Sequence, residues 1–348
     1  MQMIGKLLRK HEKAKIKALL SLVNHKSQPN LNALTESVKD LTAAQLSIKL
    51  YGYELARKLH EALPIPEKTL ANHVGLQTSL SIQDDIESDW SAHWCAELKI
   101  PVVYHRKIWE LIYILQAIFE EGHMKSCTRA LGFGCGEEPI PSYLASLGMR
   151  VTMTDLAPEQ AQSAGWTGTN QHAASLERAH KPYLVSIEKF RDLVDLQYVD
   201  MNAIPSTLSD YDLCWSMCAL EHLGSIEKGL KFIENSLVTL RPGGLAVHTT
   251  EFNINPEGPT IDNWVTVLFQ RRHIEELAKR LRMQGHYVAE LNFDLGKKVM
   301  DRFIDLPPFH HNMPVELQEW VGEQYHLKLG FDGFVTTCIG IVVRKAIA

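Results

Sequence analysis

The stretch from residue 129 to residue 155 constrains the fold of this 348-residue chain more than any other part of it. Residues 129–133 are mostly apolar, which is typical of a short buried strand. Gly134 and Gly136 follow directly, and glycine adopts positive φ easily and lets a ligand come close to the backbone. The pattern therefore predicts a strand that ends in a ligand-binding turn.

A helix and a second strand are predicted after this turn. Residues 137–147 form the helical segment, in which Pro139 and Pro141 lie early, where N–H groups lack partners in any case. Residues 151–154 are the second strand, and Asp155 stands at its carboxyl end. Ligands of doubly wound sheets bind at the carboxyl ends of the strands, and an acid one strand beyond the glycine turn can hold a ribose. We therefore expect Asp155 and the glycine turn to share one site.

The glycine turn and this acid resemble two motifs of the class I S-adenosylmethionine-dependent methyltransferases. Gly134-Cys135-Gly136 is similar to motif I, and Asp155 is similar to the ribose-binding acid. Two positions depart from that pattern, because Gly132 stands where an acid is common and Glu138 stands where a third glycine is usual. The resemblance implies that S-adenosylmethionine is the cofactor and that the backbone of the glycine turn holds it.

Later stretches resemble further motifs of this family, in the family's order. A predicted strand over 193–199 ends at Asp200-Met201, where the family places its adenine contacts. A strand over 211–217 is followed by Glu221-His222, which the family also carries at this point. Arg241-Pro-Gly-Gly244 looks like the family's connection into the fifth strand, and we expect a tight turn there.

The segment before the first strand carries Trp90, Trp94 and Trp109, which we expect to pack it onto the main domain. The alternative is a lid, since the corresponding segment of the family commonly covers the cofactor. The resemblance would then place residues 104–106 near the methionine end, where a guanidinium could pair with the carboxylate. The cofactor-binding residues that the resemblance implies are Phe133, Gly134, Cys135, Gly136, Asp155, Leu156, Asp200, Met201, Ser216 and Arg106.

The resemblance implies an α/β fold with a Rossmann-like, seven-stranded sheet whose last strand is antiparallel, and residues 334–343 would supply that strand. A helical N-terminal region precedes it. We predict three parts: helices over 1–64, a linker and lid-like helical segment over 65–124, and the methyltransferase domain over 125–348. The last part carries an insertion at 295–330, which we predict to be irregular and to help form the acceptor pocket together with the N-terminal helices.

Composition and charge limit the classes of partner. The net charge of −5 argues against nucleic-acid binding by the whole protein, and we expect the basic segment before Asp40 to be a solvated helical face rather than a membrane-surface or nucleic-acid-binding helix. No run approaches the ~18 apolar residues of a membrane span, and lysines interrupt the N-terminus. We therefore expect no membrane span, no signal peptide and a cytoplasmic location.

The six cysteines suit reduced thiols, and we expect Cys214 and Cys218 to serve packing rather than redox or metal chemistry.

Four polar residues near the ends of the fourth and fifth strands are the candidate catalytic groups: Glu221, His222, His248 and Glu251. The sulfonium already activates the methyl group, so the enzyme mainly aligns the reacting atoms and excludes water. An oxygen acceptor of high pKa also needs a general base, and imidazole titrates near neutral pH. His222 is the first candidate for this base. The alternative is that Glu221 bonds locally and His222 only shapes the pocket.

A metal site is a further alternative at the same place. Glu221-His222, His248, Glu251 and His310-His311 offer carboxylate and imidazole ligands. The Glu-His pair and the end of the fifth strand are similar to those of small-RNA 3′-end methyltransferases, which use a metal there. Because Cys218 replaces an acid of that ligand set, we expect no metal.

The sequence therefore predicts an S-adenosylmethionine-dependent methyltransferase whose acceptor is an oxygen of a small molecule or saccharide. The alternatives are a metal-assisted RNA-end methyltransferase and a non-catalytic binding protein of the same fold. An NAD-type oxidoreductase is disfavoured, because Pro139 stands where its third glycine would be.

Overall fold

The computed structural model describes residues 28, 40–61, 63, 70–158 and 175–347. The described residues divide into two compact units, one from those up to residue 51 with residues 306–322 and the other from those of 52–305 with residues 323–347. The part of the predicted N-terminal helical region that precedes residue 40 lies outside the described residues, except for residue 28. In the part of the chain that is described, no helix is both long and apolar enough to cross a membrane.

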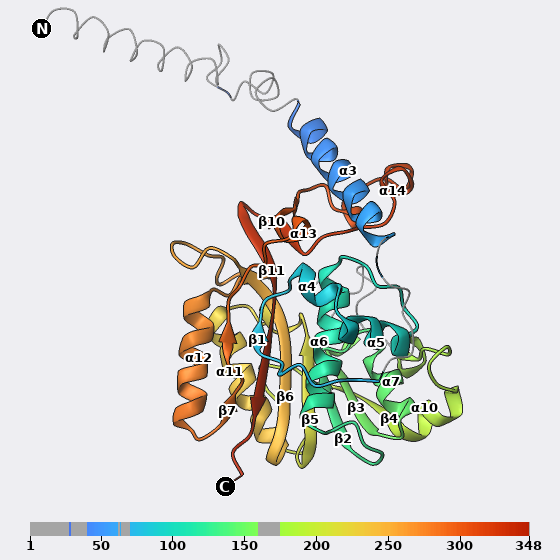
Figure 1. Cartoon of the computed structure of the whole chain (residues 1–348). Coiled ribbons are helices and arrows are strands. Elements are labelled where there is room, and N and C mark those ends of the chain that lie inside the picture. The colour runs from blue at the N-terminus through green and yellow to red at the C-terminus, as the bar shows by residue number, and fades with distance from the viewer. Residues whose placement is uncertain (1–27, 29–39, 62, 64–69, 159–174, 348) are drawn as a thin grey trace, which may run out of the picture. The chain divides into compact units, whose positions relative to one another are not determined.

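The helices vary in length from one turn to five (Figure 1). The α-helices are α3 (Leu41–His60), α4 (Gln83–Ile86), α5 (Asp89–Leu98), α6 (Arg106–Glu120), α7 (Ile140–Ser146), α9 (Leu176–Ala179), α10 (Ile187–Leu193), α11 (Ile226–Ser236), α12 (Arg271–Met283), α13 (Val299–Arg302) and α14 (Val315–Val321). Short 3₁₀ turns are η2 (Leu220–His222), η3 (Leu237–Thr239) and η4 (His310–Asn312).

The strands alternate with the longer helices, which is typical of an α/β fold. They are β1 (Thr78–Ser79), β2 (Arg129–Phe133), β3 (Arg150–Asp155), β4 (Val194–Tyr198), β5 (Tyr211–Met217), β6 (Leu240–Asn253), β7 (Tyr287–Val288), β8 (Leu291–Asn292), β9 (Ile304–Asp305), β10 (Lys328–Phe331) and β11 (Phe334–Arg344).

Nine of the described strands form one sheet in the order β4-β3-β2-β5-β6-β11-β10-β9, with β7 also paired to β11. The strands from β4 to β6 are parallel, and β11 is antiparallel to β6. These five strands with β11 and β7 form the predicted seven-stranded sheet with an antiparallel last strand. The strands β10 and β9 extend it, and β1 and β8 pair separately. The predicted fold class is therefore confirmed.

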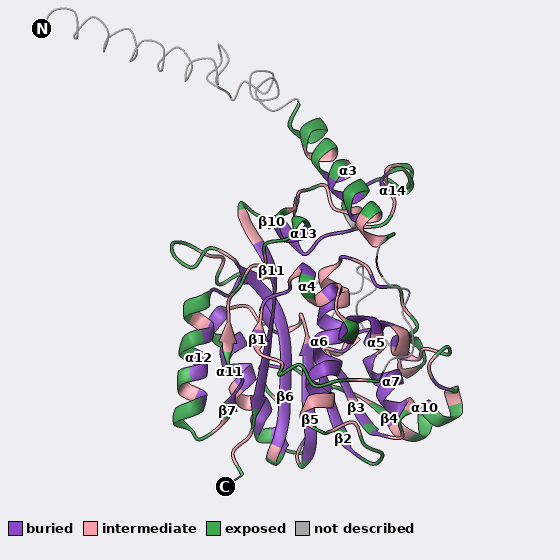
Figure 2. Cartoon of the chain, viewed as in Figure 1, coloured by how far each residue is buried: buried purple, intermediate pink, exposed green. Residues whose placement is uncertain are grey.

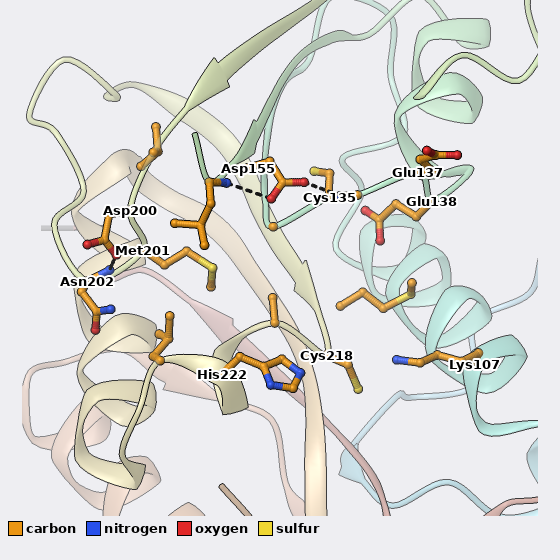
Figure 3. Close-up of a pocket in the computed structure, with 17 residues that line it drawn as sticks. Lys107, Cys135, Glu137, Glu138, Asp155, Asp200, Met201, Asn202, Cys218 and His222 are labelled. Carbon is orange, nitrogen blue, oxygen red and sulfur yellow. Dashed lines mark hydrogen bonds between the residues drawn. The ribbon is translucent and has the colours of Figure 1, made fainter. Parts of the chain in front are cut away.

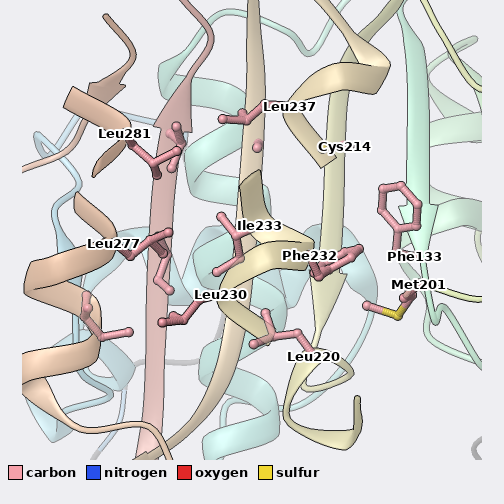
Figure 4. Packing of buried hydrophobic residues seen from close by; sticks show 14 of the residues in the cluster. Phe133, Met201, Cys214, Leu220, Leu230, Phe232, Ile233, Leu237, Leu277 and Leu281 are labelled. Atoms are coloured by element: carbon pink, nitrogen blue, oxygen red, sulfur yellow. The ribbon is translucent and has the colours of Figure 1, made fainter. Parts of the chain in front are cut away.

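The central strands β5 and β6 are buried along most of their length (Figure 2). On one face of the sheet, α11 and α12 cover a continuous apolar cluster that includes Phe133, Phe232, Ile233 and Leu277 (Figure 4). The rings of Phe133 and Phe232 meet edge to face with centroids 5.1 Å apart. On the other face, α6 packs on β11, β6 and β5, and Gly340 of β11 gives it room, because a Cβ there would lie 2.1 Å from the Tyr113 ring.

Two local predictions are wrong. Residues 241–244 do not form the expected tight turn after a helix. They lie inside β6 as an irregularity opposite Tyr211 and Leu213, because Gly243 takes φ +76° and its N–H donates to the Lys345 carbonyl at 3.1 Å. Residues 295–330 are not irregular either, since they contain α13, β9, η4, α14 and most of β10.

Candidate cofactor-binding site

A cavity of ≈ 410 Å³ opens at the carboxyl ends of β2, β3, β4 and β5 (Figure 3). Its walls are the residues that follow these four strands, together with Lys107 from α6. Parallel strands bring their carboxyl ends to one edge of the sheet, and the helices that follow begin there. The sequence-predicted residues that line the cavity are Gly134, Cys135, Gly136, Asp155, Leu156, Asp200, Met201 and His222.

The glycine turn after β2 needs both of its glycines. Gly134 and Gly136 have φ of +59° and +52°, a region that side chains with a Cβ rarely adopt. A Cβ on Gly134 would also lie 2.8 Å from the Cβ of Ala219 and 3.5 Å from the sulfur of Met201. The glycine therefore keeps open a passage between two walls of the cavity, as a ligand lying across the turn would require.

Backbone N–H groups hold the carboxylate of Asp155 beside this turn. Gly136 N donates to Oδ2 at 3.2 Å, and Leu156 N donates to Oδ1 at 2.8 Å. Cys135 N donates to the carbonyl of Thr154 at 3.1 Å, which ties the turn to the end of β3. A carboxylate has further lone pairs that can accept hydroxyl groups, as a ribose diol offers.

The turn after β4 presents a carboxylate and a thioether to the same cavity. Asp200 is exposed, and its Oδ1 accepts the N–H of Asn202 at 2.8 Å, so this side chain also orders its own turn. Met201 is 7% exposed and belongs to the apolar cluster, yet it lines the cavity as well. An apolar side chain beside a turn acid can pack on a flat heterocycle while the polar groups bind its edge.

The first turn of α6 forms the opposite wall, where Lys107 reaches the cavity and its neighbour Arg106 does not. The ammonium of Lys107 lies 3.3 Å from the buried carboxylate of Glu110, one helical turn further on. Burial alone would lower the pKa of Lys107, but the nearby carboxylate of Glu110 raises it, so the side chain is a cation at neutral pH. Arg106 instead forms an ion pair with Glu251 on β6.

Glu138, which lies two residues before α7, brings a second ionisable group to this wall. Its Oε1 accepts the indole N–H of Trp215 at 2.6 Å, and burial raises its pKa to about 8. Gly132, by contrast, has no room for the acid that the family often carries there. A Cβ on it would lie 2.2 Å from the sulfur of Cys135 and 2.5 Å from the Trp215 ring. Position 138 therefore supplies a carboxyl group to this wall, whereas position 132 cannot.

His222 lies at the far end of the cavity from Asp155 (Figure 3). Its Nδ1 lies 3.0 Å from the carbonyl oxygen of Val265 and 3.2 Å from the hydroxyl of Thr266. A carbonyl only accepts hydrogen bonds, so this contact assigns the proton to Nδ1 and the lone pair of the neutral imidazole to Nε2. Val267 N also donates to the Glu221 carbonyl at 2.9 Å, so a hydrogen bond joins the loop of residues 265–267 to η2.

Strand alternation directs three other predicted residues to the face that α11 covers. Phe133 lies in the apolar cluster there. Ser216 donates to or accepts from Nδ1 of His248 at 2.8 Å, and Ser236 of α11 bonds the other ring nitrogen at 3.1 Å. Burial lowers the pKa of His248 to about 3, so its imidazole is neutral and fully enclosed. None of the three lines the cavity.

The two predicted catalytic glutamates are also buried away from the cavity lining. Glu221 is 1% exposed, and its Oε2 accepts the hydroxyl of Thr250 at 3.0 Å. Glu251 is occupied by its ion pair with Arg106.

The three tryptophans of the segment before β2 are buried as packing residues: Trp90, Trp94 and Trp109. The indole N–H of Trp94 donates to Gln116 at 2.6 Å, and that of Trp109 donates to Asp85 at 2.7 Å.

Nine lining residues were not predicted to belong to the site: Lys107, Glu137, Glu138, Val199, Asn202, Met217, Cys218, Ala219 and Leu223. Most of them are immediate neighbours of predicted residues, so their place next to a strand end could have identified them from the sequence. Lys107 directly follows the predicted Arg106, and the packing of α6 brings Lys107 rather than Arg106 to the cavity.

Comparison with known proteins agrees with this geometry. Residues 131–248, about a third of the chain, match the family model described as "Methyltransferase domain". That segment begins in β2 and ends in β6, and so spans the turns after β2, β3, β4 and β5 that line the cavity. Among curated proteins no sequence matches the chain.

Solved structures resemble the chain only distantly. The [4+2]-cyclase SpnF is 17% identical over 68% of this chain and 81% of its own, with a TM-score of 0.44. The methyltransferase domain of bacterial CtHen1 is 13% identical over 66% and 95%, at 0.38. A SAM-dependent methyltransferase from Methanosarcina mazei is 14% identical over 64% and 95%, also at 0.38. Likenesses at this level say nothing about the acceptor.

The glycine turn, the acid after β3 and the matched segment agree with one another. Together they show that residues 131–248 form a methyltransferase domain of the class I family, for which S-adenosylmethionine is the cofactor.

Proposed function

We propose that this protein transfers the methyl group of S-adenosylmethionine to an oxygen atom of a small molecule or saccharide, with His222 as the general base. The observation that carries this proposal is the position of His222, which lines the same cavity as Gly134 and Asp155. Its Nδ1 contact with the Val265 carbonyl leaves Nε2 as the nitrogen that can take a proton. The cofactor supplies a methyl group that its sulfonium has already activated.

The cofactor's two ends would be held by opposite walls of the cavity. On the nucleoside side, Asp155 would accept the ribose hydroxyls, and Asp200 with Met201 would bind the adenine. On the amino-acid side, Lys107 would pair with the carboxylate, and Glu138 would accept a hydrogen bond from the ammonium group. A zwitterion suits this wall because it presents one cation and one carboxyl group that can accept hydrogen bonds.

Proton removal from a hydroxyl acceptor is the step that this chain's own residues would perform. A hydroxyl keeps its proton at neutral pH, so a base at hydrogen-bond distance increases the share of the nucleophilic form in the transition state. The hydrogen bonds from the 265–267 loop would orient the ring of His222. Glu221, His248 and Glu251 would then act as supporting residues, since each is held by partners of its own.

The test combines cofactor binding with methyl transfer. Full-length protein would be incubated with S-adenosylmethionine labelled in the methyl group and with panels of hydroxylated small molecules and saccharides, and labelled products would be identified by mass spectrometry. Asp155→Ala should weaken S-adenosylmethionine binding more than about tenfold in calorimetry, since charge-assisted hydrogen bonds would be lost. His222→Ala should lower turnover about 10²-fold or more while cofactor affinity stays nearly constant.

Two outcomes would overturn parts of the proposal. Unchanged cofactor affinity in Asp155→Ala would remove its ribose role. Full turnover in His222→Ala, or methylation found only at nitrogen or carbon, would remove the general-base role and the oxygen acceptor. His180→Ala is the matched control for the histidine, because His180 bonds the Val185 carbonyl at 2.7 Å and lies outside the cavity lining.

A further inference from the structure

Three side chains with metal-binding donor atoms converge behind the α6 wall, and the proposed methyl transfer uses none of them. The sulfurs of Cys218 and Cys338 lie 3.8 Å apart, and the sulfur of Cys338 lies 3.1 Å from Oε1 of Glu110. One donor atom of each residue lies within 4.8 Å of the other two. Glu110 and Cys338 are fully buried, and Cys218 lines the cavity.

A disulfide does not suit these two cysteines. Cys218 follows β5 and donates its N–H to Thr249 of β6 at 3.0 Å, whereas Cys338 lies opposite Glu251 on the other side of β6. Neighbouring strands are about 4.8 Å apart, so two residues that flank one strand are separated by roughly 9 Å. Disulfides need Cα atoms within about 7 Å, so the backbone would have to move before a bond could form.

A metal ion bridging the two sulfurs requires no such movement. Zinc–thiolate bonds of about 2.3 Å at the tetrahedral angle place two sulfurs about 3.8 Å apart, which is the separation seen here. Two thiolates and a carboxylate are a donor set that zinc accepts, and three protein ligands leave one position for water or another ligand. We propose that Glu110, Cys218 and Cys338 bind a thiophilic divalent cation, Zn²⁺ above all, at the edge of the cavity.

The surroundings hold the three donors in place, as outer contacts do at metal sites. The hydroxyl of Thr249 donates to Oε2 of Glu110 at 2.8 Å, and Lys107 lies 3.3 Å from Oε1 of the same carboxylate. Arg106 donates to the sulfur of Cys338 at 3.5 Å. Hydrogen bonds of this kind stabilise a thiolate as well as a thiol, because the donor faces a lone pair of sulfur.

Charge balance permits a metal ion to replace two thiol protons in this cluster. Without a metal, the cations Arg106 and Lys107 match the carboxylates of Glu110 and Glu251, and the thiol of Cys338 donates to Glu110. Zn²⁺ binding would release two thiol protons and bring two positive charges, so the net charge of the cluster would not change. Burying charge is costly only when it is uncompensated, and here it is compensated in both states.

A second donor set, Cys218 with Glu221 and Glu251, shares one cysteine with this site. There the guanidinium of Arg106 already forms an ion pair with Glu251. Lys107 likewise pairs with Glu110, so a resident cation does not distinguish the two sets. Zinc binds thiolates well, and the set with two sulfurs is therefore the one that we assign.

Metal binding can be measured without any assay of methyl transfer. Tag-free full-length protein would be stripped with a chelator and titrated with Zn²⁺ in calorimetry and with Co²⁺ in absorption spectroscopy. We expect one ion per chain, release of two protons for each Zn²⁺, and a thiolate-to-cobalt charge-transfer band with the visible bands of tetrahedral Co²⁺. A cobalt spectrum without the charge-transfer band would overturn the site, even if Co²⁺ bound elsewhere.

The variants Cys338→Ser and Glu110→Gln should each weaken Zn²⁺ binding at least tenfold. Cys214→Ser is the matched control, because Cys214 is also fully buried but lies on the α11 face, and it should bind as the unmodified protein does. Equal affinity in Cys338→Ser and Cys214→Ser would refute the assignment. S-adenosylmethionine binding by each variant would show that its cavity is folded.

A measurement on the unmodified protein covers the case in which the variants do not fold. Iodoacetamide should alkylate Cys218 through the cavity more slowly when Zn²⁺ is present, and the exposed Cys127 should react at an equal rate with and without the metal. Mass spectrometry of the peptides separates the two sites. Equal rates at Cys218 with saturating Zn²⁺ would overturn the proposal.

Discussion

The two faces of the central sheet are covered in opposite ways. The face under α11 and α12 is an apolar cluster, and the imidazole of His248 beside it is enclosed between two serine hydroxyls. The face under α6 carries the buried carboxylates of Glu110 and Glu251 and the half-buried ammonium of Lys107. The same strands supply both faces, because successive side chains of a strand point in opposite directions.

One face of the sheet therefore mainly stabilises the fold, whereas the other also supplies groups that can contact a ligand. Apolar burial stabilises the fold without directing any group toward a ligand, and the α11 face contributes few residues to the cavity. The α6 face holds charged groups that are costly to bury unless they are paired, and its pairs continue to the cavity wall through Lys107. Substitutions on the two faces should therefore have different signatures.

The largest effect is expected on the apolar face, from Phe232→Ala. Phe232 is 1% exposed and packs edge to face on Phe133, so the truncation leaves a cavity beneath the glycine turn. We expect a loss of about 3–5 kcal/mol in the free energy of unfolding, measured in urea. Phe232→Leu, which keeps most of the volume, should lose less than about 2 kcal/mol.

The same variant should keep its affinity for S-adenosylmethionine within about threefold wherever it is folded, because Phe232 does not line the cavity. Calorimetry below the unfolding transition measures this. A large loss of affinity with little loss of stability would mean that the two faces are not separate in the way described.

An intermediate effect is expected from Glu138→Gln on the polar face, and it should depend on pH. Burial raises the pKa of Glu138 to about 8, above the value near 4.5 of an unfolded glutamate. Between these values the folded state keeps a proton that the unfolded state has lost, so wild-type stability falls as pH rises through this window. The amide side chain of the variant cannot titrate, but its oxygen can still accept the Trp215 N–H.

Urea unfolding of both proteins without cofactor, at pH 5, 6.5 and 8.5, tests this expectation. The stability of wild type relative to Glu138→Gln should fall by on the order of 3 kcal/mol between the first and the last pH. A difference between the two proteins that is independent of pH would show that Glu138 is not held protonated.

The smallest effect is expected from Lys107→Met, and it should appear in binding. Removal of the ammonium should weaken S-adenosylmethionine about tenfold, or about 1.4 kcal/mol, because one charge-assisted contact with the carboxylate would be lost. 5′-Methylthioadenosine has the nucleoside but no amino-acid group, so its affinity should stay the same. Lys231→Met on the exposed side of α11 is the control.

Competition calorimetry measures the affinity of each variant for the two ligands and so tests this prediction directly. Equal losses for S-adenosylmethionine and 5′-methylthioadenosine would place Lys107 outside the methionine end. Lys107→Arg, which keeps the charge, should recover most of the affinity if the ammonium acts through its charge.

The positions of the parallel strands along the chain and the residues at their carboxyl ends follow from the sequence alone. The glycine turn, Asp155 and Asp200-Met201 each stand at the end of an apolar strand, and local pattern places such residues at one sheet edge in any parallel α/β fold. Positive φ at Gly134 and Gly136 was likewise predictable, because glycine is the residue that adopts it readily.

The tertiary structure decided which polar residues reach the cavity. Ser216, His248 and Glu251 looked like site residues because they lie at or near strand ends, but alternation and packing turned the first two to α11 and paired the third with Arg106. The packing of α6 also selected Lys107 over Arg106 as the cation in the cavity, and it brought Glu110 beside two cysteines 120 residues apart. Local sequence cannot specify such contacts, because they depend on how a helix far away in the chain lies on the sheet.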